Sequence, residues 1–284
     1  MAIARALSGV EIVSIDSMQV YRGMDVGTAK PTLAERAEVP HHLIDIADPS
    51  EDFTVVRFRE ACDSALAEIE ARGNQALLVG GTGLYVRAVI DRLEPPGEWP
   101  VIRAELEAEP DVGALHARLD ALDPLAASRM TNTNRRRIVR ALEVSLGSGK
   151  PFSSFGPGLG TYGATGVTQV GLRMPRETRS AQIRCRFDAQ VAAGFLDEVA
   201  ALAAREQPLS RTAAQALGYR ELLAHVRGEM GLDEAVDLAI TRTRQFAVRQ
   251  ERWFRRDPRI VWVDAEANPL EEVLTLLGDS SRCT

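Results

Sequence analysis

Two short polar stretches follow apolar runs of the kind that form buried strands, and their residue types could do chemistry. The run from Glu11 to Ile15 leads into DSMQVY at residues 16–21, and the run from Ala76 to Val79 leads into GGTGLY at residues 80–85. Open α/β sheets bind ligands outside the carboxyl ends of their strands, so both stretches are predicted at a binding edge.

The two stretches offer different chemistry. Asp16 supplies a carboxylate that could accept a proton. The glycines around Thr82 would let backbone amides approach an anion, and amides at the helix start expected there favour negative charge. Simpler roles stay open, since Asp16 or Ser17 could cap a turn and Thr82 could be an ordinary N-cap. The glycine-rich turn also has no lysine to make a phosphate-binding loop.

Arginines cluster in two places although the chain carries a formal net charge of −6. This charge argues against a protein that coats nucleic acid without selectivity, but it leaves room for a local basic groove. The alternative is that each cluster is a solvated helix face, which is the commoner meaning of a run of charges. The clusters are Arg135, Arg136, Arg137 and Arg140, and Arg249, Arg252, Arg255 and Arg256.

Alternating strand and helix patterns would position these residues, and they predict an α/β fold: a parallel sheet with helices on both faces. The patterns predict helices at 54–72, ending before Gly73, and at 233–255 and 270–277. Strands are expected at 11–15, 42–46, 76–79, 167–172 and 260–263.

The middle of the chain differs from the rest. Residues 101–147 show only helical patterns, with a helix start at Asp123-Pro124, and residues 151–166 are rich in Gly, Ser and Pro. We therefore expect an α/β core, which would carry the chemistry, at 1–100 and 167–284, and a mainly helical insertion domain at 101–166.

Several classes of protein are disfavoured by simple features. No run approaches the ~20 apolar residues of a membrane helix, and the first residues do not resemble a secretory leader. Cys62, Cys185 and Cys283 are far apart and form no Cys-x-x-Cys pair, which argues against disulfides and against a zinc site shared with histidines. We expect a cytoplasmic protein that does not engage a membrane.

Ordered blocks of the sequence resemble the signature of the bacterial tRNA dimethylallyltransferase family, also called tRNA isopentenyltransferases. The longest is DSMQVYRGMDVGTAKP at residues 16–31. The others are VPHHLID (39–45), VGGTGLY (79–85), RALEV (140–144), QALGYR (215–220) and RQERWFR (249–255). The resemblance extends to about residue 256 and implies a nucleotide-binding, P-loop NTPase/kinase-like fold.

The resemblance implies transfer of a dimethylallyl group from dimethylallyl diphosphate to the exocyclic N6 amine of the adenosine 3′ of the anticodon in tRNA, with Mg²⁺. Asp16 matches the family's general base, and Thr82 matches the residue that contacts the bridging oxygen of the diphosphate. Arg186 matches an arginine directed at the diphosphate, with Arg184 as the competing candidate. Ser17, Met18 and Gln19 match the turn that recognises the adenosine.

The resemblance also implies which residues meet the tRNA anticodon stem-loop, whose target base must be flipped into a pocket. A half-buried core position is the alternative for Tyr219. We expect a monomer. The matching residues, besides the Asp16 to Gln19 turn, are Arg136, Arg137, Ile138, Val139, Arg140, Gln215, Gly218, Tyr219, Arg220, Arg249, Gln250 and Arg252.

One block of the family pattern, a strand followed by a Gly-x-x-x-x-Gly-Lys loop, does not occur in these residues. The one Gly-Lys pair, Gly149-Lys150, precedes Pro151. We expect that about 15–25 residues of the family pattern lie upstream of Met1 because of a misassigned start codon. Without that strand, the sheet would have two unpaired strand edges in its interior.

Three alternatives remain open. An adenylate isopentenyltransferase would prenylate a free nucleotide, but the helical insertion and the basic helix near residue 250 favour tRNA. A catalytically inactive RNA-binding protein is the second alternative, because the phosphate-binding loop is absent. A nucleoside monophosphate kinase-like protein is the third, and the Asp16 to Gln19 motif disfavours it.

Overall fold

The structure, a computed structural model, describes residues 1–156 and 158–280 and divides into two compact units. One comprises Met1–Arg92 with Ala164–Thr284, and the other comprises Leu93–Gly163. The helical unit therefore begins several residues before Val101, where the composition of the sequence had suggested a boundary.

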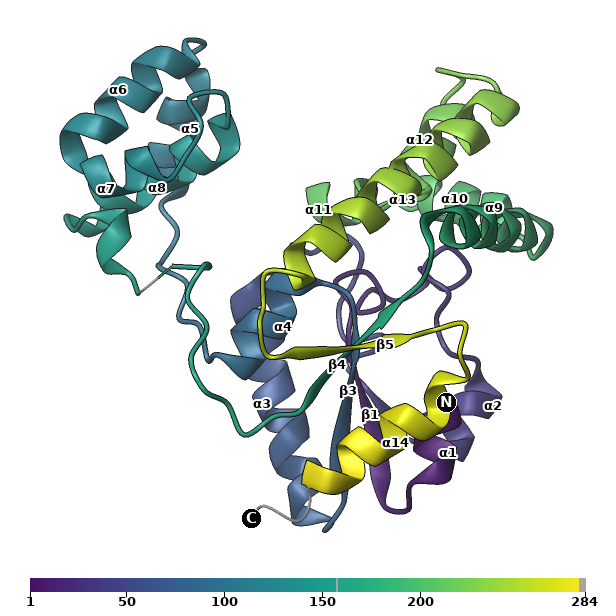
Figure 1. The fold of residues 1–284 in the computed structure, drawn as a ribbon. Coiled ribbons are helices and arrows are strands. Elements are labelled where there is room, and N and C mark those ends of the chain that lie inside the picture. Colours follow the sequence, from purple (N-terminus) through teal and green to yellow (C-terminus); the bar gives the residue numbers. More distant parts are fainter. Residues whose placement is uncertain (157, 281–284) are drawn as a thin grey trace. The chain divides into compact units, whose positions relative to one another are not determined.

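A three-stranded parallel sheet forms the centre of the larger unit (Figure 1). Strand β1 (Val10–Ile15) lies between β2 (His41–His42) and β3 (Gln75–Gly80). Ile15 pairs with Gly80 at the carboxyl ends of β1 and β3. This register places the residues that follow the two strands, Asp16 and Gly81, at the same edge of the sheet.

A second parallel pair, β4 (Gln169–Arg173) with β5 (Ile260–Asp264), is separate from that sheet. Among the described residues, β3 pairs only with β1 and β4 pairs only with β5. Residues 164–284 and the first sheet nevertheless belong to one compact unit, in which α14 (Pro269–Ser280) packs on both β4 and β5.

The second strand is shorter than the sequence predicts. We expected extended chain at 42–46, but β2 ends at His42. The reason is local backbone conformation, because Leu43 and Asp45 have φ values of +63° and +59°. These left-handed residues turn the chain out of the strand, and Asp45 is held there by ion pairs with Lys30 and Arg36.

Helices cover the sheet and share one core with it, as the predicted alternation of strands and helices requires. Helix α3 begins after Thr54, which caps the amide of Arg57, and it buries one face through Phe58 and Ile69. Gly73, at φ +74°, follows its end as expected. The other helices of this unit are α1 (Ala2–Ala6), α2 (Leu33–Glu38), α4 (Gly83–Ile90), α9 (Arg176–Ala192), α10 (Phe195–Ala203), α11 (Arg211–Ala214), α12 (Tyr219–Val226) and α13 (Leu232–Phe254), and α3 is Val55–Ala71.

The smaller unit has a hydrophobic core of its own. Asp123 caps the helix that starts at Pro124, as predicted, by accepting the amide of Ala126 at 3.0 Å. Leu119 and Leu142 are fully buried in that core. Its elements are α5 (Pro100–Ala108), α6 (Val112–Leu122), α7 (Pro124–Ser128), α8 (Arg135–Ser148) and the 3₁₀ helix η1 (Phe152–Ser154).

The cysteines and the lengths of the helices bear on two of the protein classes considered above. Cys62 is buried and Cys185 exposed, and neither forms a disulfide, whereas Cys283 lies outside the described residues. Among the helices described here, none has both the length and the apolar character needed to cross a bilayer.

Candidate active site

The two polar stretches found in the sequence meet at the carboxyl edge of the sheet. The hydroxyl oxygen of Thr82 accepts a hydrogen bond from the backbone N–H of Ser17 at 3.2 Å, and it lies 3.4 Å from the Ser17 hydroxyl. The pairing of Ile15 with Gly80 brings about this contact between residues 65 positions apart. A carboxylate-bearing turn and a glycine-rich turn therefore share one site.

Asp16 is held by its own turn. Its Oδ1 atom accepts the backbone N–H of Met18 at 2.7 Å and that of Gln19 at 3.3 Å. This is the turn-capping role that the sequence left open for Asp16, and it engages only one of the two carboxylate oxygens. Capping and proton acceptance are therefore compatible, because Oδ2 can serve a ligand while Oδ1 maintains the turn.

The amide of Gln19 has a fixed orientation. Its Nε2 faces two carbonyl oxygens, those of Thr28 at 3.2 Å and Ala29 at 3.4 Å. Its Oε1 accepts the hydroxyl of Ser14 at 2.8 Å. Carbonyls only accept hydrogen bonds, so the nitrogen must face them, and Oε1 keeps one lone pair for a donor on a ligand.

The glycines of the second turn have a packing role that the sequence did not reveal. A methyl group on Gly81 would lie 1.9 Å from Nε2 of Gln250, and one on Gly83 would lie 2.3 Å from the Trp253 ring. Gln250 also donates to the carbonyl of Gly81 at 2.7 Å. The C-terminal half of α13 thus packs directly against the glycine-rich turn, and this close approach requires glycine at positions 81 and 83.

Thr82 does not act as a conventional side-chain cap. It occupies the N-cap position of α4, yet its hydroxyl forms no capping hydrogen bond and is turned toward Ser17. The ordinary N-cap role that the sequence allowed is therefore absent, and the hydroxyl is available at the site edge.

The two arginines considered for the diphosphate differ in their surroundings. Arg184 donates to Asp237 at 2.8 Å, so its guanidinium is already paired. Arg186 is exposed on the same helix, α9. Of the two, Arg184 is engaged in an ion pair and Arg186 is exposed to solvent.

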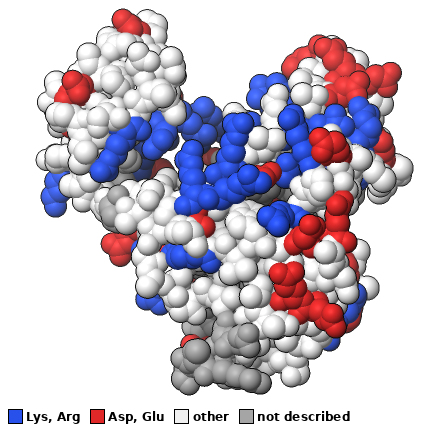
Figure 2. All heavy atoms as spheres, viewed as in Figure 1, with Lys and Arg blue, Asp and Glu red and all other residues white. Residues whose placement is uncertain are grey.

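Basic side chains gather on the larger unit near this site. Figure 2 shows Lys and Arg side chains grouped over the region of the C-terminal half of α13, and acidic side chains at the opposite end of that helix. Arg249 and Arg252 are exposed there, and Gln250 is partly buried against Gly81. Gln215 and Arg220 are exposed on the same unit.

Four of the residues expected to contact tRNA are buried in this structure. Tyr219 is 1% exposed and its hydroxyl donates to Glu198 at 2.5 Å, so the core-aromatic alternative holds. Gly218, at φ +84°, is packed against the rings of Phe187 and Phe195. Ile138 and Val139 lie in the core of the helical unit, because they occupy the inward face of α8.

The arginines of α8 are not equivalent. Arg136 and Arg137 are exposed. Arg140 instead donates to the carbonyl of Pro96 at 2.7 Å and pairs with the buried Glu143 at 3.0 Å. Arg140 is therefore held by contacts within this unit, whereas Arg136 and Arg137 are exposed.

Sequence reasoning missed the residues that support the site from α9 and α10. Gln190 and Glu198 both bind the backbone of residues 25–27. A further supporting residue, Lys30, has a buried side chain that donates to the carbonyl of Tyr21 and pairs with Asp25 and Asp45. Lys30 belongs to the longest matching block, which was a usable signal. Nothing in the sequence around Glu198 distinguishes it from its exposed neighbour Asp197.

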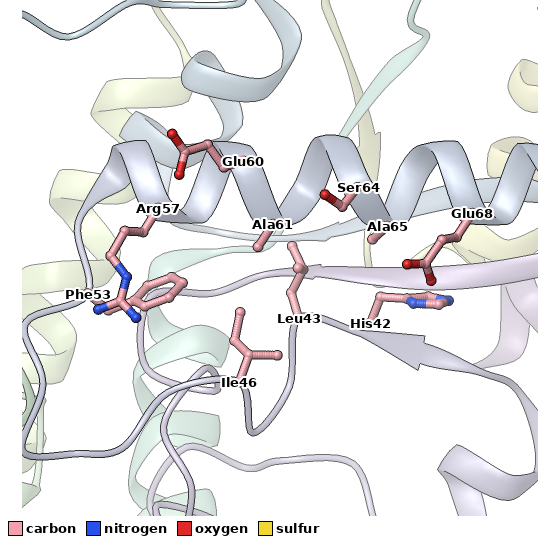
Figure 3. A pocket seen from close by; sticks show the side chains of 10 residues that line it. All are labelled: His42, Leu43, Ile46, Phe53, Arg57, Glu60, Ala61, Ser64, Ala65 and Glu68. Atoms are coloured by element: carbon pink, nitrogen blue, oxygen red, sulfur yellow. The ribbon is translucent and has the colours of Figure 1, made fainter.

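The described residues also line a pocket away from the Asp16 and Thr82 turns. A cavity of about 500 Å³ lies between α3 and the segment after β2 (Figure 3). Leu43, Phe53 and Ala61 line it, with Arg57 and Glu60 also among its lining residues. It contains neither Asp16 nor Thr82, so it is distinct from the candidate active site.

Comparison with known proteins agrees with this architecture. The model of the family described as IPP transferase matches residues 19–257. A tRNA dimethylallyltransferase of Kineococcus radiotolerans is 49% identical over 279 residues, covering 95% of this chain and 87% of the relative. One from Nocardioides sp. is 47% identical over 264 residues, covering 92% of this chain and 84% of the relative.

Solved structures give the same result. The tRNA isopentenylpyrophosphate transferase of Bacillus halodurans is 38% identical with a TM-score of 0.71, and the match covers 99% of this chain and 90% of that one. A eukaryotic dimethylallyltransferase acting on tRNA, at 24% identity and a TM-score of 0.81, shares the fold; that match covers 99% of this chain and 75% of that one. The P-loop-like α/β fold expected from the sequence is thereby confirmed. The chain belongs to the IPP transferase family.

Proposed function

We propose that this protein transfers a dimethylallyl group from dimethylallyl diphosphate to the N6 amine of the adenosine 3′ of the anticodon in tRNA. The observation that carries the proposal is the family match. Relatives named tRNA dimethylallyltransferase are 47–49% identical to this chain over more than nine tenths of its length. The meeting of the Asp16 and Thr82 turns at one sheet edge supports it, because the reaction needs an acceptor base beside a leaving group.

Asp16 is the proposed general base. With Oδ1 occupied by the amides of Met18 and Gln19, Oδ2 would accept a proton from the N6 amine as nitrogen attacks the allylic carbon. The C–O bond to the diphosphate breaks as the C–N bond forms, and the diphosphate leaves with the bonding pair. Gln19 Oε1 and the turn of Ser17 and Met18 would orient the adenine.

Thr82 and Arg186 are the proposed contacts of the diphosphate. The hydroxyl proton of Thr82 would turn from Ser17 toward the bridging oxygen, where charge develops. Arg186 would face the outer phosphate oxygens, since an exposed guanidinium can bind phosphate in a bidentate manner. Arg184 is less suited because Asp237 already occupies it.

Mg²⁺ fits this site only as a companion of the substrate. Among the described residues no group of three His, Cys, Asp or Glu side chains could hold a metal. Mg²⁺ commonly keeps several waters and binds through substrate phosphates with one or two protein oxygens. The ion would neutralise diphosphate charge, and Asp16, Ser17 and Thr82 are the side-chain oxygens at this edge that could meet its water shell.

The tRNA would be bound through exposed arginines on each unit separately. The proposed contacts on α13 are Arg249, Gln250 and Arg252, and those on α8 are Arg136 and Arg137. Gln215, just after α11, and Arg220, in the first turn of α12, are also proposed contacts. Phosphate contacts of this kind set affinity and register, and the flipped adenosine sets specificity. We further propose that the protein acts as a monomer. We also propose that it acts in the cytoplasm, in keeping with its free thiols Cys62 and Cys185.

The test is a prenylation assay with radiolabelled dimethylallyl diphosphate and Mg²⁺. The acceptors are an anticodon stem-loop with the target adenosine, the same stem-loop with guanosine there, and AMP. Label on the first RNA alone is the expected result. Label on AMP in preference to RNA would indicate an adenylate isopentenyltransferase, and stem-loop binding without any label would indicate an RNA-binding protein.

A further inference from the structure

A carboxylate from outside the two polar stretches organises the segment beside the acceptor turn. Glu198, in the first turn of α10, is bound by three consecutive backbone amides. Its Oε2 accepts the N–H of Asp25 at 2.8 Å and of Val26 at 2.7 Å, and its Oε1 accepts that of Gly27 at 3.2 Å. Such a row of amides is a backbone anion-binding concavity, and here it is filled by the protein's own side chain.

The site of this carboxylate is built for it. The Tyr219 hydroxyl donates to Oε1 at 2.5 Å, and burial together with the carboxylate raises the pKa of Tyr219, so the hydroxyl stays protonated. Gly27 is tightly confined, because a methyl group there would lie 2.2 Å from the Phe195 ring and 2.5 Å from that of Tyr219. The backbone at Gly27 is therefore packed closely against these two aromatic rings, and Tyr219 also binds Glu198.

The opposite side of the same segment is also fixed. Gln190 on α9 donates to the carbonyl of Val26 at 2.7 Å and to that of Gly27 at 3.2 Å. The N–H groups of residues 25–27 are thus held by α10, and the C=O groups of residues 26 and 27 are held by α9. Hydrogen bonds to charged groups contribute more than neutral ones, so Glu198 is the stronger of the two anchors.

The segment leads directly into the carbonyls that orient Gln19. Thr28 and Ala29, whose oxygens accept Nε2 of Gln19, follow Gly27 in the chain. If residues 25–27 shift, these two carbonyls move, and the remaining partner of the Gln19 amide is the Ser14 hydroxyl. A hydroxyl can donate or accept, so it does not by itself decide whether Oε1 or Nε2 faces it. Oε1 of Gln19 would then no longer be fixed to present a lone pair to an amine donor.

We propose that Glu198 is a positioning residue for recognition of the acceptor base: it fixes residues 25–27, which hold the Thr28 and Ala29 carbonyls that orient Gln19 toward the amine. This inference rests on the proposed function, since it concerns how the same site distinguishes adenine. Glu198 itself does not touch the substrate, so its effect is on discrimination between bases.

The test compares affinity for two anticodon stem-loops that differ in one group. One carries the target adenosine, and the other carries inosine, which has a carbonyl in place of the amine. In Glu198→Ala we expect the ratio of the two affinities to fall by about tenfold, equivalent to about 1.4 kcal/mol. Glu198→Gln keeps one acceptor oxygen but places an NH₂ group against the Gly27 N–H. Its affinity ratio should therefore lie between those of the parent and Glu198→Ala.

Two controls separate positioning from general destabilisation. Asp197→Asn removes a neighbouring exposed carboxylate from the same helix turn and should leave the ratio unchanged. In a Gln19→Ala background, Glu198→Ala should change the ratio less than about twofold, because coupled residues are not additive. Thermal melts of every variant confirm that folded protein is compared.

The outcomes are distinct. The inference would be overturned if both Glu198 variants kept the parent's affinity ratio. It would also be overturned if Glu198→Ala lowered the ratio equally in the parent and in the Gln19→Ala background. Either result would leave the proposed function standing. A parent protein that does not bind the adenosine stem-loop would instead contradict the proposed function, and the inference with it.

Discussion

Replacement of Asp16 by asparagine separates the chemistry of this residue from its structural role. In the structure, Oδ1 accepts the amides of Met18 and Gln19 at 2.7 and 3.3 Å, and an asparagine oxygen can accept both. The turn should therefore persist in Asp16→Asn. The variant loses only the ability to take up a proton at the second position, because an amide nitrogen is a donor.

Removal of a general base typically lowers the rate by about 10²–10⁴-fold, which corresponds to about 2.7–5.4 kcal/mol of barrier. We expect a loss of this size in the single-turnover rate constant, with stem-loop affinity within about threefold of the parent, since less than 0.7 kcal/mol of binding is removed. Asp16→Ala serves as the comparison, because it also removes the acceptor for both amides and should weaken RNA affinity.

The assay is rapid-quench prenylation of the adenosine stem-loop with enzyme in excess, alongside filter binding of the same RNA. A rate for Asp16→Asn within twofold of the parent would refute the assignment of Asp16 as the base. A large loss of affinity in Asp16→Asn would show instead that the carboxylate acts mainly in binding.

Two further predictions concern charge. Arg252→Ala and Arg137→Ala should each reduce the slope of log affinity against log salt by about one, because each removes a phosphate contact, and unchanged slopes in filter binding would mean that these are solvated faces. Hydrogen bonds from Arg72, Asn74 and His42 hold the pKa of the buried Glu11 at about 2, below its ordinary value of 4.5. Because the pKa is lower in the folded state, the ionised carboxylate stabilises the fold above pH 4.5, and this contribution disappears as the pH falls toward 2. Over that range the free energy of unfolding of the parent should fall by up to about 3 kcal/mol more than that of Glu11→Gln, as measured by urea titration at each pH. Parallel stability curves for the two proteins would contradict this linkage.

Much of the fold could be predicted from local patterns. Apolar runs located β1 and β3, and the Thr54 cap and Gly73 bracketed α3, because capping and periodicity depend on residues a few positions apart. The strand expected at 42–46 failed for a reason outside such patterns. Lys30 and Arg36 hold Asp45 in a left-handed conformation, and these partners lie well before the strand in the chain.

The sequence by itself determined the family, the order of the elements and the two turns that could do chemistry, since these are written in contiguous residues. Only the tertiary structure decided how those turns are used. It placed Thr82 against Ser17 rather than in a cap, and it seated Gln250 on Gly81. It also buried Tyr219 against Glu198. Such contacts join residues far apart in the chain, and their existence depends on the packing of whole elements, which no local pattern encodes.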